Sequence, residues 1–247
     1  MRSNDGANGW EHRKEMVAQV LRKLNPDIIG TQEGYWPQID QLQEMLPDYH
    51  FVGVSRDDGE REGETCAIFY KRALLASVNS GTFWFSDTQN IPGSRHPECS
   101  HARICTWARF TTTDSTTFSV YNVHLDHESQ AAREQSIVLL LEHLETAAPS
   151  RPAIVMGDFN MLPDNPAYRA MIGAASKPLI DSFALLHPDR TQQGTFHDFT
   201  GRTDMGRIDY IFATADVQLI DSEIVMDAFD GRYPSDHFPA LTRLALP

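Results

Sequence analysis

The chain contains 247 residues, of which 41% are hydrophobic and 22% are charged, and its 21 basic and 34 acidic residues give a formal net charge of −13. This composition is typical of a globular protein, and without a linker or an internal repeat in the sequence we predict one domain over residues 1–247. The charge argues against a general binder of duplex DNA, which needs a basic face, and no apolar run approaches the roughly 20 residues of a membrane-spanning helix.

The spacing of apolar residues predicts helices and strands along the chain. Apolar positions at helical spacing, ended by Pro26, predict an amphipathic helix over about residues 11–24. The first half continues with a strand over 27–32, a helix over about 39–46, and strands over 66–70, 77–85, 103–111 and 117–124. The second half adds a helix over about 137–148, a strand over 153–156, a helix that Asn165 and Pro166 open, and strands over 208–214 and 217–225.

Several of these strands are adjacent in sequence and need only hairpins to join them, which predicts antiparallel pairs beside helices. We therefore expect an α/β fold of the α+β type, with two packed mixed or antiparallel sheets and the helices outside them. The charge-dense stretch 56–64 is interpreted as a solvated loop.

The three cysteines, Cys66, Cys99 and Cys105, contain no CxxC pair, so neither a zinc site nor a disulfide framework is indicated and all three are expected to be reduced. The first ten residues contain no apolar stretch of the kind found in a signal peptide. The expected location is therefore the cytoplasm, or outside the cell if a signal peptide lies upstream.

Five strand-like runs end in charged or amide residues suited to hydrolytic chemistry. Alternation places Asn122, His124 and Asp126 on one face of their strand. Asp209 falls within an apolar strand, where an ionised carboxylate needs a partner such as a histidine. Each run alone is ordinary, but packing does not explain their joint occurrence. In chain order they are QE at 32–33, NVHLDH at 122–127, GDFN at 157–160, RIDYIF at 207–212 and SDH at 235–237.

This set of residues suits metal-assisted displacement at phosphorus. Carboxylates without clustered cysteines favour a hard cation, Mg²⁺ or Mn²⁺, over zinc. We expect Glu33 and Asp236 to ligate this cation. We expect His237, oriented by Asp209, to act as the general base that activates water.

The remaining polar residues are assigned to water and to the substrate phosphate. Asp158 is expected to hold the same water, and His124 and Asn160 to donate hydrogen bonds to phosphoryl oxygens. The candidate substrate-binding residues are three phosphate clamps and one ring that can stack on a base, namely Arg103, Arg207, Arg232 and Phe196.

With these motifs in this order, the chain resembles the endonuclease/exonuclease/phosphatase superfamily, the deoxyribonuclease-I-like fold. The resemblance implies a four-layer α/β sandwich and Mg²⁺-dependent phosphoester cleavage, with Glu33 as a metal ligand and His237 paired with Asp209. It also implies roles for Asp158 and Asn160 around water and phosphate. Within the superfamily the chain looks most like small stand-alone bacterial and fungal hydrolases of unassigned substrate, which carry NDG-x(3)-W, RDDG, SGTFW and DGRYPSDHFP.

The chain departs from the family pattern at its start. Members of the family begin with a strand that ends in an asparagine, and this sequence starts at Met1, where that strand would just have finished. The first strand and its metal-site asparagine are therefore expected to be missing from the sequence.

The leading hypothesis is a Mg²⁺- or Mn²⁺-dependent phosphodiesterase or phosphomonoesterase. Its expected partner is a small phosphoester, a nucleotide or a single-stranded nucleic acid. A second hypothesis is a metallo-β-lactamase-like dizinc hydrolase, because NVHLDH overlaps the pattern HxHxDH if Asn122 replaces the first histidine. A third is a catalytically silent binding protein of the same fold, which the missing strand suggests.

Overall fold

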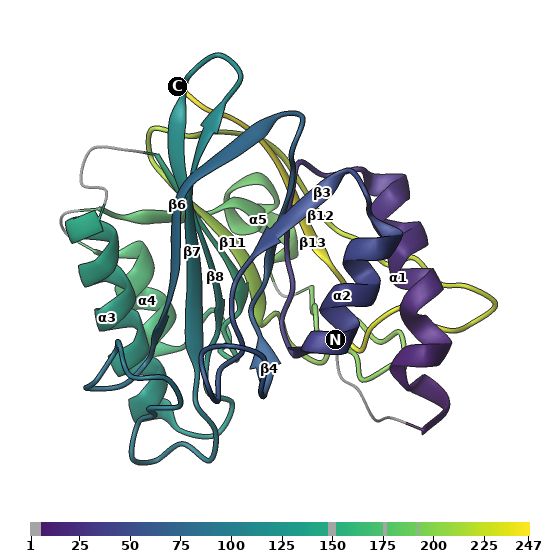
Figure 1. Cartoon of the computed structure of the whole chain (residues 1–247), viewed down its shortest axis with the longest axis horizontal. Coiled ribbons are helices and arrows are strands. Elements are labelled where there is room, and N and C mark those ends of the chain that lie inside the picture. The colour runs from purple at the N-terminus through teal and green to yellow at the C-terminus, as the bar shows by residue number, and fades with distance from the viewer. Residues whose placement is uncertain (1–5, 148–151, 175–176, 192) are drawn as a thin grey trace.

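The computed structural model of the chain describes residues 6–147, 152–174, 177–191 and 193–247 and is built in layers (Figure 1). Two helices, α3 (Gln130–Ala147) and α4 (Pro166–Ile172), cover one side of a large sheet. Smaller sheets pack on its other side, and α1 (Trp10–Leu24) and α2 (Trp36–Met45) cover them in turn. This arrangement agrees with the expected order of helices, sheet, sheet and helices.

The large sheet has six strands in the order β10-β11-β9-β8-β7-β6. Neighbouring strands are antiparallel except β8 and β9, which run parallel and are connected through α3. In chain order the strands are β6 (Leu75–Trp84), β7 (Ile104–Thr112), β8 (Thr117–His124), β9 (Ala153–Asp158), β10 (Leu179–Asp181) and β11 (Asp209–Thr214). The parallel pair places the carboxyl ends of β8 and β9 at the same edge of the sheet.

The second sheet layer differs from the single sheet that was expected, because it is divided. One part has three strands, β1 (Ile28–Gly30), β5 (Ile68–Lys71) and β3 (Tyr49–Val52), in that order. Another part pairs β12 (Gln218–Ile224) with β13 (Ala240–Ala245). A third pairs two short strands, β2 (Gly34–Tyr35) and β4 (Glu64–Thr65).

Among the described residues, β1 pairs only with β5 and β13 pairs only with β12, so each has one unpaired edge. A groove of about 760 Å³ is lined by residues of both strands. Apolar side chains from α1, β1, the large sheet and β13 line much of it, including Val17, Ile28, Val120, Met156 and Leu244. At its other end the groove reaches the polar ends of β9 and β11.

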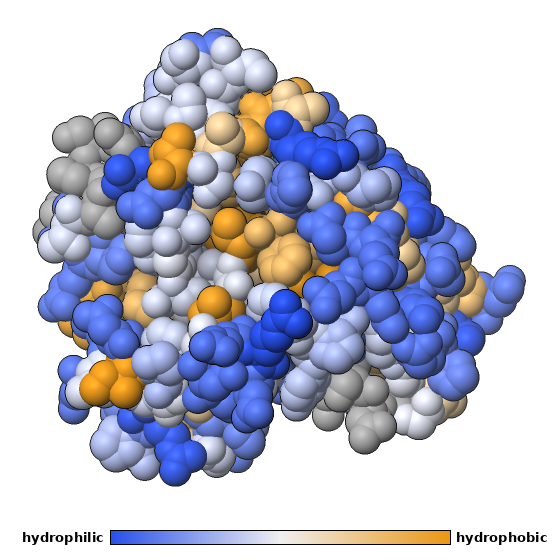
Figure 2. Space-filling model, viewed as in Figure 1, coloured by the Kyte–Doolittle hydropathy of each residue, from blue (hydrophilic) through white to orange (hydrophobic). Residues whose placement is uncertain are grey.

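Each pair of layers encloses a separate apolar core. The core between the large sheet and α3 and α4 includes Tyr121, Phe159 and Phe212, and the core between the two sheet layers includes Ile68 and Phe110. A third core, which includes Ile39, Leu42 and Phe69, lies beneath α1 and α2. Figure 2 shows hydrophobic side chains mainly along the middle of one face, over the strands, whereas the flank with α1 and α2 is hydrophilic.

All four predicted helices are present, and Asn165 caps α4 as expected by accepting a hydrogen bond from the Ala167 backbone N–H at 2.9 Å. Ala148, the predicted end of the third helix, lies outside the described residues. The eight predicted strands match β1, β5, β6, β7, β8, β9, β11 and β12 with shifts at their ends. The prediction missed β3, β10, β13, the short β2 and β4, and helix α5 (Ser182–Leu186).

The three cysteines and one residue of the charge-dense stretch are buried. Cys66, Cys99 and Cys105 are buried and form no disulfide. The stretch 56–64 is exposed over most of its length, but Arg56 is buried and forms an ion pair with Glu64, so the solvated-loop interpretation is wrong at that residue. No helix among the described residues is long and apolar enough to cross a membrane.

Candidate active site

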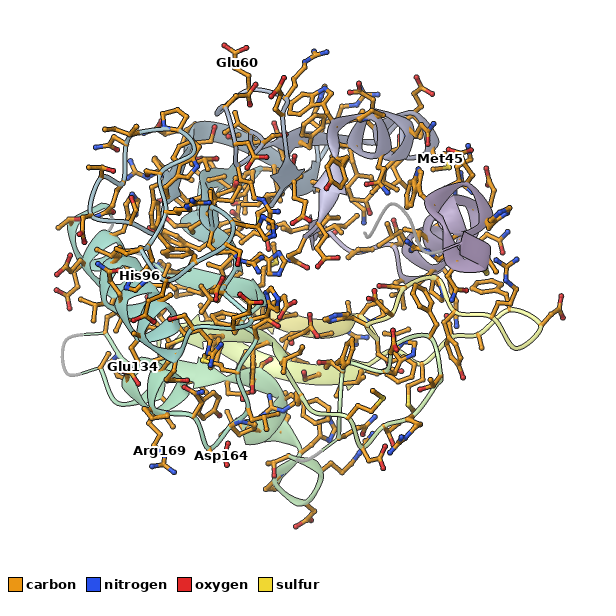
Figure 3. All side chains as sticks on the ribbon, turned by 90° about the horizontal axis from the view of Figure 1, so that it is seen from below. Met45, Glu60, His96, Glu134, Asp164 and Arg169 are labelled. Atoms are coloured by element: carbon orange, nitrogen blue, oxygen red, sulfur yellow. The ribbon has the colours of Figure 1, made fainter. Side chains whose placement is uncertain are left out.

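Three strand ends bring polar side chains together at one edge of the large sheet. His124, at the end of β8, lies opposite Asp158 at the end of β9, and Asp158 also lies opposite Asp209 at the start of β11. Figure 3 views the molecule from below, toward this end of the sheet. The labelled residues Glu60, His96 and Asp164 lie on loops near the outline of the molecule in this view. The strand register alone therefore places three of the predicted site residues side by side.

A loop residue completes the centre of the site. His237 lies between β12 and β13, and its Nδ1 is 2.8 Å from Asp209 Oδ2. Asp158, Asp209 and His237 each offer one ligand atom, and these atoms all lie within 4.8 Å of one another. We refer to these three residues as the acidic cluster.

Burial and charge shift the pKa values of two members of the acidic cluster. Burial raises the pKa of Asp158 to about 7, and the neighbouring Asp209 carboxylate adds to the rise. Burial lowers the pKa of His237, but its contacts with Asp209, followed by the charges of Asp158 and Asp236, outweigh this and leave the pKa at about 10. Without a bound cation the surrounding carboxylates favour the protonated imidazole, and the positive charge of a cation would counter them and favour the neutral ring that a general base needs.

Glu33 and Asp236, the predicted metal ligands, line the same groove as the acidic cluster. The backbone of Glu33 is left-handed, with φ of 58°, a conformation that a non-glycine residue adopts only where its surroundings impose it. Asp236 is buried, and its Oδ1 accepts a hydrogen bond from the Ser235 hydroxyl at 3.3 Å.

His124 and Arg103 form a second buried group beside the cluster. His124 Nε2 is 3.6 Å from Asp158 Oδ2, and an Arg103 amino group is 3.0 Å from the same ring nitrogen. Burial, followed by the charge of Arg103, holds the pKa of His124 well below its usual value, so the ring is neutral. Arg103 also contacts Asp126 at 3.4 Å and His127 at 2.8 Å.

Asn160 lies on the turn that follows β9 and has a left-handed backbone with φ of 47°. Its backbone N–H donates to Asp158 Oδ1 at 2.9 Å, which ties the turn to the acidic cluster. Its side-chain amide donates to the Leu125 carbonyl at 3.0 Å, and so links the ends of β8 and β9.

The other predicted substrate-binding residues are not gathered in one place. The Phe196 ring stands edge-on to the His237 ring, with 5.1 Å between their centroids, so it borders the site. Arg232 is exposed and donates to the Ala7 carbonyl at 2.9 Å.

Arg207 lies in the interior of the protein. Its side chain is 1% exposed, donates to Asp181 Oδ2 at 2.8 Å, and lies over the Tyr210 ring. An enclosed side chain of this kind is poorly placed to meet a phosphate, and the role of Arg207 as a phosphate clamp stays a prediction that its burial does not favour. The Arg207 guanidinium pairs with the Asp181 carboxylate inside the protein.

Sequence reasoning missed Arg13 on α1. The residue is buried, lines the groove, and donates to the Pro234 carbonyl at 2.7 Å, three residues before His237. Its position was a usable signal, because Arg13 falls at helical spacing from Met16, Val17 and Val20 and is thus a cation on the apolar face of an amphipathic helix.

The donor set fits a hard divalent cation. The groove collects the carboxylates of Glu33, Asp158, Asp209 and Asp236 beside one imidazole, and oxygen donors are those that Mg²⁺ and Mn²⁺ prefer. The raised pKa of Asp158 shows that burial and the nearby anion make its ionised form unfavourable. A bound cation would remove that penalty.

Comparison with known proteins agrees with this fold. A model of the Endonuclease/Exonuclease/phosphatase family matches residues 2–237. The solved structure of a mannosyl-6-phosphatase from Bacteroides thetaiotaomicron superposes with a TM-score of 0.91 at 31% identity, covering 99% of this chain and 96% of that one.

Curated relatives also match by sequence. The uncharacterized protein L388 of Acanthamoeba polyphaga mimivirus is 31% identical over 159 residues, which are 61% of this chain and 59% of that protein. The CCR4-Not complex 3'-5'-exoribonuclease subunit Ccr4 of Mycosarcoma maydis is 24% identical over 304 residues, covering 95% of this chain and 45% of that protein. The chain thus spans about half the length of these curated relatives.

Proposed function

The chain belongs to the Endonuclease/Exonuclease/phosphatase family, and from this premise we propose that it is a Mg²⁺- or Mn²⁺-dependent phosphomonoesterase that acts on a small substrate such as a sugar phosphate. The observation that carries the proposal is the acidic cluster, in which His237 and two carboxylates meet at the end of a groove that Glu33 and Asp236 also line.

Each residue of the site has a proposed task. Glu33 and Asp236 hold the cation, which when bound polarises a phosphoryl oxygen and screens its negative charge. Asp209 orients His237, which positions and deprotonates the attacking water, and Asp158 holds the same water.

The substrate phosphate is proposed to be met by hydrogen-bond donors on the other side of the cluster. His124 and Asn160 donate to its oxygens, and Arg103 keeps His124 in place. Phe196 borders the leaving group.

Two observations favour a small monoester over a polymer. The matched mannosyl-6-phosphatase is similar over nearly the whole of both chains. Arg103 and Arg207 are buried in contacts with neighbouring side chains, so these two arginines do not offer a polyanion a basic track. A second candidate function is cleavage of short single-stranded RNA, which the likeness to the 3'-5'-exoribonuclease subunit and the ring of Phe196 beside His237 favour.

The dizinc hypothesis loses its support in the structure. It requires Asn122 to stand where a metal ligand would be, but Asn122 is fully buried and its amide bonds to groups of the neighbouring layer. The family match, which extends across the GDFN and SDH motifs, also argues against it.

The proposal is tested by hydrolysis of p-nitrophenyl phosphate, bis-p-nitrophenyl phosphate, mannose 6-phosphate and a short RNA, each with Mg²⁺, Mn²⁺ or Zn²⁺ added after treatment with EDTA. We expect Mg²⁺ or Mn²⁺ to restore turnover and the monoesters to be preferred. Preference for the diester and RNA would favour the nuclease. No turnover of any substrate with any metal would overturn the proposal and favour a silent binding protein.

We also propose that the groove between β1 and β13 accommodates one further extended strand, as expected for the family. Two unpaired strand edges face a slot with apolar walls, which is the environment that a strand satisfies with backbone hydrogen bonds and apolar side chains. Hydrogen exchange tests this: the amides of Ile28–Gly30 and Ala240–Ala245, on strands with an unpaired edge, should exchange faster than those of Val120–Val123 in the middle of the large sheet.

A further inference from the structure

Asn122 is a buried amide that joins the two sheet layers. It lies on β8, in the middle of the large sheet, and none of its side chain is exposed. Its Nδ2 donates to the Thr31 carbonyl at 3.0 Å and to the Ala67 carbonyl at 2.9 Å, and its Oδ1 accepts from Gln32 Nε2 at 2.6 Å. All three partners lie outside the large sheet, on the segments that follow β1 and precede β5.

The contact leaves little freedom on either side. Both amide hydrogens and the oxygen of Asn122 are used, so the side chain has one defined orientation. Gly30, the last residue of β1, packs directly against it, because a Cβ at position 30 would lie 3.0 Å from Asn122 Oδ1 and 2.9 Å from Met156 Cε. The end of β1 is therefore held tightly against β8.

Both ends of this connection lead into the candidate active site. On one side, Gln32 directly precedes Glu33, whose backbone is left-handed with φ of 58°. On the other side, Asn122 lies two residues before His124, which is in register with Asp158. Glu33 lies on the segment between β1 and β2 and Asp158 ends a strand of the large sheet, so Asn122 ties together the segments that carry them.

We infer that Asn122 is a positioning residue that fixes Glu33 opposite the acidic cluster and thereby sets the affinity of the site for a divalent cation. The inference rests on the proposed function. Residues that orient metal ligands without touching the metal typically change metal affinity by about 10- to 100-fold when they are replaced. Asn122 fits this description, since it bonds to both residues that precede Glu33 and not to Glu33 itself.

The test is a titration of purified protein with Mn²⁺ alone, followed by electron paramagnetic resonance of the free ion. Asn122→Leu keeps the number and branching of the side-chain heavy atoms and removes all three hydrogen bonds, and we expect it to raise the Kd for Mn²⁺ by about 10- to 100-fold. Gln32→Leu removes one of the three bonds and should raise the Kd by a smaller factor. If Asn122→Leu does not fold, the Kd of Gln32→Leu for Mn²⁺ tests the inference in its place.

Thr214→Val is the matched control. Thr214 is buried, and its hydroxyl oxygen accepts from the Ala153 backbone N–H at 2.9 Å, across two strands of the same sheet. It ends β11, whereas Asp209 begins that strand, so the lost bond lies far from the site. We expect a lower melting temperature and an unchanged Kd. An equal rise of Kd in this variant would show that the effect of Asn122→Leu is general loosening, and would overturn the inference.

The Kd of Glu33→Gln, alone and combined with Asn122→Leu, separates a positioning role of Asn122 from a role in packing alone. If Asn122 acts through Glu33, Glu33→Gln should raise the Kd by itself and add little in the Asn122→Leu background. Full additivity, or wild-type affinity in Asn122→Leu and Gln32→Leu, would overturn the inference while the proposed function stands. If the wild-type protein itself bound no Mn²⁺, the proposed function would fail and the inference with it.

Discussion

Asp209 and His237 are 28 residues apart in the sequence, and Asp209 Oδ2 lies 2.8 Å from His237 Nδ1. Because the carboxylate occupies Nδ1, the other ring nitrogen, Nε2, is the one left to accept a proton from the attacking water. The pair thus has the geometry of a general base and the group that orients it.

The first prediction concerns this pair. His237→Ala should lower kcat by roughly 10²- to 10⁴-fold, the usual contribution of a general base, and Asp209→Asn should lower kcat by a smaller factor. Steady-state kinetics at saturating Mg²⁺ measure both, with thermal unfolding to confirm the fold. His12→Ala, which removes an exposed imidazole on α1, is the control. Wild-type turnover in His237→Ala would contradict the mechanism.

A second prediction follows from the raised pKa of Asp158, which burial and then Asp209 bring to about 7. An acid with a higher pKa in the folded than in the unfolded protein costs stability once the pH exceeds its unfolded value near 3.8. In EDTA, the melting temperature of Asp158→Asn should therefore exceed that of the wild type by a margin that grows from pH 5 to pH 8. A margin independent of pH would contradict this. Saturating Mg²⁺ should shrink or reverse it.

A third prediction concerns Arg207, which the structure encloses with Asp181. Removing one partner of a buried ion pair costs about 3–5 kcal/mol, so Arg207→Ala should lower the free energy of unfolding by that amount. Arg202→Ala is the matched control, because Arg202 and Asp204 form an exposed pair at 2.9 Å whose loss should barely change the free energy of unfolding. Urea unfolding measures both. A stable Arg207→Ala protein with a raised KM would support the role as a phosphate clamp.

A fourth prediction concerns Gly157, which precedes Asp158 in β9. Its φ is 140°, and a Cβ there would lie 2.1 Å from the Val123 carbonyl oxygen on β8. Gly157→Ala should therefore cost more than about 3 kcal/mol and weaken Mn²⁺ binding, since it separates the two parallel strands. Gly231→Ala, at φ of 76° with open space around it, should cost only about 1–2 kcal/mol. Equal losses in urea unfolding would contradict the steric argument.

Much of the site was accessible from the sequence because its residues stand at the ends of apolar strands. The runs that contain His124, Asp158 and Asp209 were assigned to one hydrolytic site, and the strand register places these three side chains at one edge of the sheet. Their catalytic roles stay predictions. Helices α1 and α3 were predicted because long periodic segments carry their own signal.

The rest depends on contacts between distant segments. An arginine after a strand looks the same whether it faces substrate or, like Arg207, pairs with a buried Asp181 26 residues away. Strand β10 has three residues, too few to show a period, and β13 becomes a strand by pairing with β12. The three hydrogen bonds of Asn122 could not be predicted from the sequence either, because its partners are distant from it along the chain.

The burial of the three cysteines has a practical consequence. Burial raises the pKa of the Cys66 and Cys99 thiols to about 12 and that of Cys105 well above its usual value, so almost no thiolate is present in the folded protein. A thiol-reactive dye should therefore react slowly until the structure opens. The rate of labelling therefore reports how often the interior opens, and it measures the effect of Mn²⁺ or of any variant without an introduced cysteine.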